Sequence, residues 1–131
     1  MKWLRILAVL FALSLMLGEV WRSWGVGRPI MFVMDDQLMG GFLLAATWAV
    51  GKETVRNRIA FAAAWGVNAG MLYGSFFGKV FAPEEAQAGN WDLGILTWLI
   101  GLAFAVSLIG LWLSITLPFA DAPRDRPNEH T

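Results

Sequence analysis

The sequence contains no cysteine, and its single histidine, His130, is the penultimate residue. Without cysteine the chain forms no disulfide, carries out no thiol chemistry and holds no zinc or iron–sulfur centre through thiolates. One histidine is also too few for a histidine metal cluster or for a haem held by two histidines. No nucleophile with a neighbouring base can be assembled, and no glycine-rich phosphate loop is present. We therefore predict a protein that is not an enzyme and that needs no metal ion and no cofactor.

Charge is also scarce. Charged residues make up 15% of the 131 residues, against about 25% in soluble domains, and the formal net charge is zero. The chain therefore has no overall basic field that would attract a nucleic acid. Hydrophobic residues make up 57% of the sequence and gather in long runs, which is typical of integral membrane proteins.

These runs predict an all-α integral membrane protein, a bundle of four transmembrane helices in a lipid bilayer. The membrane domain covers residues 1–118, with spans at about 3–21, 30–51, 59–81 and 92–117. Residues 119–131 are rich in proline and charge, which predicts a disordered cytoplasmic tail.

The beginnings of two helices are ambiguous. The first apolar run follows Lys2 and Arg5 as in a signal peptide, but no small-residue cleavage site follows it, which favours an uncleaved helix. The second helix has only 15 uncharged residues, from Gln37 to Gly51, short of the roughly 20 that cross a bilayer. It begins either near Pro29, a residue favoured in the first helical turn, or at Asp36 acting as its N-cap.

The positive charges predict the orientation. Seven of the ten Lys and Arg residues lie in the N-terminal segment, the 52–58 loop and the tail. Since cytoplasmic segments are enriched in Lys and Arg, both termini are predicted to be cytoplasmic. Small size, short loops and the lack of cysteine favour a bacterial inner membrane.

The third predicted helix carries a stripe of small residues at every fourth position: Ala62, Gly66, Gly70, Gly74 and Gly78. In membranes such stripes, or glycine zippers, let a neighbouring helix approach closely. The stripe is interpreted either as tight packing within this chain, with the third helix central, or as a surface for a homodimer or a larger membrane complex.

An acidic group is the second candidate site. Asp35 and Asp36 lie near the predicted membrane edge with Glu19, and Arg22 and Arg28 are possible ion-pair partners. Carboxylates within a span are costly and usually functional, so the group could take up a proton or a cation on the non-cytoplasmic side. Alternatively, the two aspartates cap a helix and form interfacial ion pairs.

Two polar residues, Asn68 and Tyr73, fall within the third span and are predicted to be buried. A hydrogen bond to a neighbouring helix is the ordinary role of such residues.

Two functional hypotheses follow. The first is an accessory or scaffolding membrane protein without catalytic machinery, which acts through glycine-mediated packing with itself or a partner. The second is a small proton- or cation-coupled transporter that uses the acidic group. The position of Asp35 and Asp36 distinguishes them: carboxylates that line a cavity favour transport, and carboxylates that cap a helix at the surface favour the first hypothesis.

Overall fold

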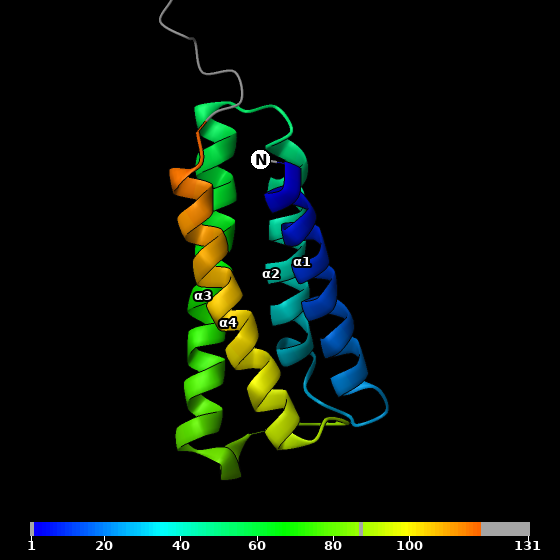
Figure 1. The fold of residues 1–131 in the computed structure, drawn as a ribbon. Coiled ribbons are helices and arrows are strands. Elements are labelled where there is room, and N and C mark those ends of the chain that lie inside the picture. Colours follow the sequence, from blue (N-terminus) through cyan, green and yellow to red (C-terminus); the bar gives the residue numbers. More distant parts are fainter. Residues whose placement is uncertain (1, 87, 119–131) are drawn as a thin grey trace, which may run out of the picture.

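The computed structural model describes residues 2–86 and 88–118 (Figure 1). These residues form four α-helices and one short 3-10 helix, η1 (Pro83–Glu85). The α-helices, which run up and down side by side, are α1 (Lys2–Ser23), α2 (Ile30–Ala49), α3 (Val55–Phe81) and α4 (Leu93–Thr116). The prediction of an all-helical protein is confirmed, and the predicted disordered tail lies outside the described residues.

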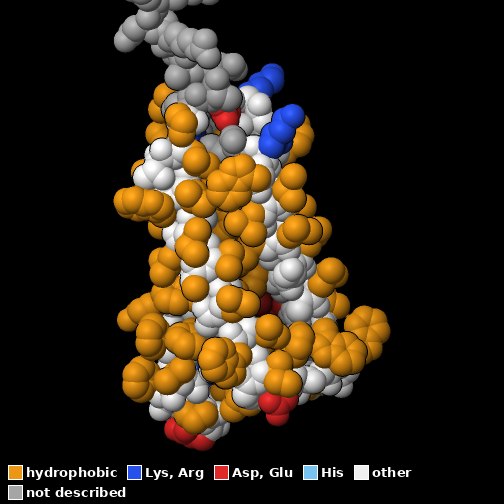
Figure 2. Space-filling model, in the orientation of Figure 1, with side chains coloured by type: hydrophobic (Ala, Val, Ile, Leu, Met, Phe, Trp, Pro, Cys, Tyr) orange, Lys and Arg blue, Asp and Glu red, His pale blue; other side chains and the backbone are white. Residues whose placement is uncertain are grey.

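Three of the described helices, α1, α2 and α4, are long and apolar enough to cross a membrane. Apolar side chains cover the face shown in Figure 2, and acidic side chains lie at its lower end. The longest helix, α3, has 27 residues but is not among the three. Its glycines, together with Asn68 and Ser75, make it less apolar. The structure therefore supports a membrane protein with three candidate spans.

Local sequence explains where the helices begin. α2 begins at Ile30, directly after Pro29, so the N-cap alternative for Asp36 is wrong and both aspartates lie inside the helix. At α3 the Thr54 hydroxyl accepts a hydrogen bond from the Asn57 amide at 3.1 Å, and this cap starts the helix before residue 59. At α4 the Asp92 carboxylate accepts from the Ile95 amide at 3.1 Å.

Helices adjacent in sequence pack together, α1 against α2, α2 against α3 and α3 against α4, whereas α1 and α4 contact each other much less. The centre of the core is the fully buried ring of Trp65 on α3. Its ring centroid lies 5.3 Å from that of Phe11 on α1 and 6.2 Å from that of Phe61. The bundle is therefore least tightly packed between its first and last helices, α1 and α4.

Close approach between helices occurs where a large side chain meets a glycine. A Cβ atom at Gly110 of α4 would lie 2.6 Å from the Trp65 ring, and one at Gly101 would lie 2.8 Å from Phe76. Between α1 and α2, a Cβ atom at Gly40 would lie 2.5 Å from Met16. In each case one helix supplies the large side chain and its neighbour supplies the space.

The small-residue stripe of α3 does not pack in this way, so the first of its two interpretations, tight packing within this chain, does not hold for its glycines. A Cβ atom at Gly70, Gly74 or Gly78 would meet no atom within 4 Å, and one at Gly66 would just reach Leu111 at 4.0 Å. Ala62 is half-buried. The aromatic face of α3 packs into the core instead, because aromatic side chains bury far more apolar area than glycines do.

Candidate functional site: a charged cavity between the helices

A cavity of about 1040 Å³ lies at the end of the bundle that carries the loop between α1 and α2 and the loop between α3 and α4. All four helices contribute to it. Most of its wall is apolar, formed by side chains such as Phe11, Leu15, Met39, Leu72, Leu96 and Ile100. Its size is at the upper end of the range typical of small-molecule sites.

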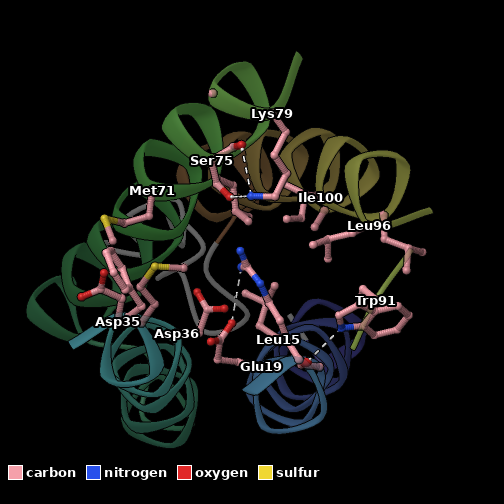
Figure 3. Close-up of a pocket in the computed structure, with 18 of the residues that line it drawn as sticks. Leu15, Glu19, Asp35, Asp36, Met71, Ser75, Lys79, Trp91, Leu96 and Ile100 are labelled. Carbon is pink, nitrogen blue, oxygen red and sulfur yellow. Dashed lines mark hydrogen bonds and ion pairs between the residues drawn. The ribbon is translucent and has the colours of Figure 1, made fainter. Parts of the chain in front are cut away.

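The cavity also contains five buried or half-buried charged side chains, which we call the ion cluster: Glu19, Arg22, Arg28, Asp36 and Lys79. They come from α1, the following loop, α2 and α3. In Figure 3, Glu19 and Asp36 lie on one side of the cavity and Lys79 extends toward them from the other.

The segment before α4 closes this end of the cavity against α1. The Asn90 side chain donates to the carbonyls of Trp21 at 2.8 Å and Trp24 at 2.7 Å. The Trp91 indole lines the cavity and donates to the Gly18 carbonyl at 3.1 Å. The contact has no room for a side chain at Gly89, where φ is +59° and a Cβ atom would overlap the Arg22 carbonyl.

Glu19 is the centre of the ion cluster. Its residue is only 3% exposed, and its carboxylate pairs with the Arg28 guanidinium and, at 3.6 Å, with that of Arg22. The Ser23 hydroxyl donates to the same carboxylate at 2.9 Å, and the Asp36 side chain lies beside it (Figure 3). A buried carboxylate is tolerated when it is paired and hydrogen-bonded in this way. The arginines predicted as partners of the aspartates therefore pair with Glu19.

Lys79 is buried without a carboxylate partner. Its residue is 8% exposed, and its ammonium donates to the Ser75 hydroxyl at 2.9 Å and weakly to the Ser75 carbonyl at 3.5 Å. Across the two described segments, no carboxylate forms an ion pair with this ammonium. Its direct partners are thus the dipoles of Ser75, and the carboxyl groups of Asp36 and Glu19 act on it only across the cavity.

Arg28 also has a hydrogen-bond donor that is not used. Its side chain is 7% exposed, and its Nε–H, although buried, has no hydrogen-bond partner among the described residues. The guanidinium carbon lies 5.8 Å from the centroid of the Phe32 ring, which also lines the cavity. A buried N–H donor without an acceptor costs free energy, and a ligand atom could satisfy it.

The predicted acidic group is only partly assembled. Asp36 is half-buried beside Glu19, whereas Asp35 is exposed and lies toward Met71, away from the centre of the cavity (Figure 3). Within the described parts of the chain, no three acidic or histidine side chains form a group that could hold a metal ion.

The other predicted residues are distributed around α3. Gly74 and Gly78 line the cavity, whereas Ala62, Gly66 and Gly70 do not. Asn68 is fully buried and donates to the Met39 carbonyl of α2 at 3.3 Å and to the Ala64 carbonyl at 2.8 Å. Tyr73 is 57% exposed, so its predicted burial is wrong; its ring contacts Phe77 and Phe104.

Sequence reasoning missed Lys79 and Ser75 as site residues. The sequence feature that could have identified them is their spacing of four residues. In a helix that continues to residue 81, this spacing places both side chains on one face.

Comparison with known protein families, with curated proteins and with solved structures gives no match to this chain.

Proposed function

We propose that this chain is a small membrane transporter that binds its solute in the cavity and couples binding to a proton. The observation that carries the proposal is the position of Glu19, a buried carboxylate inside an ion cluster that lines a large cavity. Charged groups at membrane depth are costly and usually mark solute or proton pathways. Cavities between the helices of a bundle are common ligand sites.

The pairing of the carboxyl groups supports a proton as the coupling ion. Asp36 lies beside Glu19 (Figure 3), and two neighbouring carboxylates repel each other, so a shared proton would relieve that repulsion. A metal cation is less well supported, since the acidic side chains of the described residues do not converge on a metal-binding group.

In this proposal all four helices cross a bacterial inner membrane and both termini are cytoplasmic. The cavity then opens toward the non-cytoplasmic side, and α3 is the span that carries Lys79 into it. The lower hydropathy of α3 fits such a role, because α2 and α4 pack against it and cover part of its surface.

The test is a pH jump applied to proteoliposomes on a solid-supported membrane. The wild-type protein is expected to give a transient current as protons bind within the membrane, and Glu19→Gln and Asp36→Asn are expected to abolish it. Asp35→Asn, at an exposed neighbour, is the matched control and keeps the current. A wild-type current no larger than that of empty liposomes, or a full current in Glu19→Gln, would refute the proposal.

A second candidate function, scaffolding through helix contacts, is favoured by a different observation. Gly70 of α3 is exposed, and no atom lies within 4 Å of the position its Cβ atom would take. We propose that this face receives a helix of a second molecule. Gly70→Ile should then shift the protein to a smaller species in size-exclusion chromatography with light scattering, whereas Gly41→Ile, at an equally open position on α2, should not.

A further inference from the structure

The charges inside the cavity do not balance. Two carboxyl groups, Glu19 and Asp36, face three cationic groups, Arg22, Arg28 and Lys79. The remaining acidic residues of the wall, Asp35 and Glu85, are exposed on the surface of the molecule. The buried interior therefore carries an excess of positive charge, which is larger still when Glu19 and Asp36 share a proton.

The excess positive charge lies on groups that have hydrogen-bond donors available for a ligand. Glu19 engages the two arginines, so Lys79 is the cation left without a carboxylate. The Nε–H of Arg28 is the second unused donor, and both side chains are more than nine-tenths buried. An ammonium and a guanidinium N–H together form a site for an oxyanion, because charge-assisted hydrogen bonds to an anion are the strongest available to both.

Beyond the ion cluster the described wall is mostly apolar, and its polar side chains Ser14, Ser75 and Trp91 already form hydrogen bonds within the chain. The surface that continues from Lys79 along α3 and α4 is formed by Leu72, Ile100, Ala103 and Val106. A ligand that fills this space has one charged end and an apolar remainder.

The cavity also opens sideways between α1 and α4. These helices contact each other little, and exposed apolar side chains such as Leu17, Leu99 and Leu102 line the cavity there. Figure 2 shows an acidic side chain at the bottom of a hollow between the two helices. A ligand with an acyl chain could therefore reach the site from the lipid phase.

We propose that the cavity binds an anionic amphiphile, with its oxyanion head group on Lys79 and Arg28 and its acyl chain along the apolar wall of α3 and α4. This inference rests on the proposed solute-binding role of the cavity and names the class of its ligand. The same chemistry is available from a free single-chain amphiphile and from an anionic phospholipid of the surrounding bilayer.

The test is calorimetric titration of the protein in phosphatidylcholine nanodiscs with dodecyl phosphate, with empty nanodiscs as background. The expected result is saturable binding at one site, weakened about tenfold or more in Lys79→Met, since a charged hydrogen bond is lost. Lys79→Arg should stay within about threefold of wild type because it keeps a cationic donor. Lys52→Met, at an exposed loop position, should bind as the wild type does.

Three further titrations define the ligand. Dodecyltrimethylammonium and dodecanol should not compete, whereas inorganic phosphate should compete only at far higher concentration because it lacks the chain. Nanodiscs that contain phosphatidylglycerol should show reduced binding if the lipid is the source of the anion, and unchanged binding if a free amphiphile is. Either result supports the shared chemistry.

Tighter binding of the cationic amphiphile, or wild-type affinity in Lys79→Met, would overturn the inference. Misfolding of this variant is monitored by its thermal stability, which should be equal to or higher than that of the wild type, because an uncompensated buried charge is removed. Equilibrium binding needs no transport. Lys79-dependent binding without a pH-jump current would therefore refute the transporter proposal alone, and a current without such binding would refute this inference alone.

Discussion

At the scale of single residues, Glu19 determines the stability of the site, because its buried carboxylate pairs with two arginines. We predict that Glu19→Ala lowers the free energy of unfolding by about 3–5 kcal/mol, since it removes the carboxylate that pairs with the buried Arg28 guanidinium. Denaturant unfolding in detergent micelles measures the loss. Glu84→Ala, an exposed glutamate on η1, is the control and should change stability little. An equal, small effect of both substitutions would show that Glu19 is not the centre of the cluster.

A second residue-scale prediction concerns the loop that closes the cavity. Gly89→Ala should destabilise by about 1–3 kcal/mol from its left-handed backbone alone, and by more because its Cβ atom meets the Arg22 carbonyl. Gly25→Ala separates the two causes, since Gly25 also has a positive φ, +71°, but has no atom within 4 Å of its Cβ position. Faster amide exchange at Asn90 in the Gly89 variant, and not in the Gly25 variant, would report loss of the α1 contact. Equal effects would mean that backbone strain is the only cause.

At the scale of helices, the two kinds of glycine on α3 and α4 should respond in opposite ways. Gly110→Ala places a methyl group 2.6 Å from the Trp65 ring and should destabilise by about 1–3 kcal/mol, as overpacking does. Gly70→Ala meets nothing and should be neutral or stabilising by up to about 1 kcal/mol, because alanine is the better helix former. Thermal unfolding of both variants in one detergent makes the comparison. A larger loss for Gly70→Ala would mean that the stripe of α3 is a tight interface after all.

These helices also show how far the sequence predicts the structure. Apolar runs and turn residues located all four helices, and Pro29 marked the start of α2, because those features act locally. The direction in which α3 turns its faces was not predictable in the same way. Its glycines permit a close approach between helices but bury little apolar surface. Trp65 and Phe76 instead pack against Gly110 and Gly101 of α4, and these pairs become neighbours only in the folded bundle. The same limit applies to the site: the acidic residues were visible, but the pairing of Arg28 with Glu19 depends on how the loop folds back.

At the scale of the whole molecule, the topology depends on α3, which alone among the long helices of the described residues is not apolar enough to be a candidate span. If α3 crosses the membrane, Lys52 and Glu84, which precede and follow it, lie on opposite sides. The lack of native cysteine allows a direct test with Lys52→Cys and Glu84→Cys, both at exposed positions. With both termini cytoplasmic, an impermeant maleimide should label residue 84 in intact cells and residue 52 only after permeabilisation. Labelling of both from the same side would show that α3 does not span, and the cavity would then lie at a membrane surface.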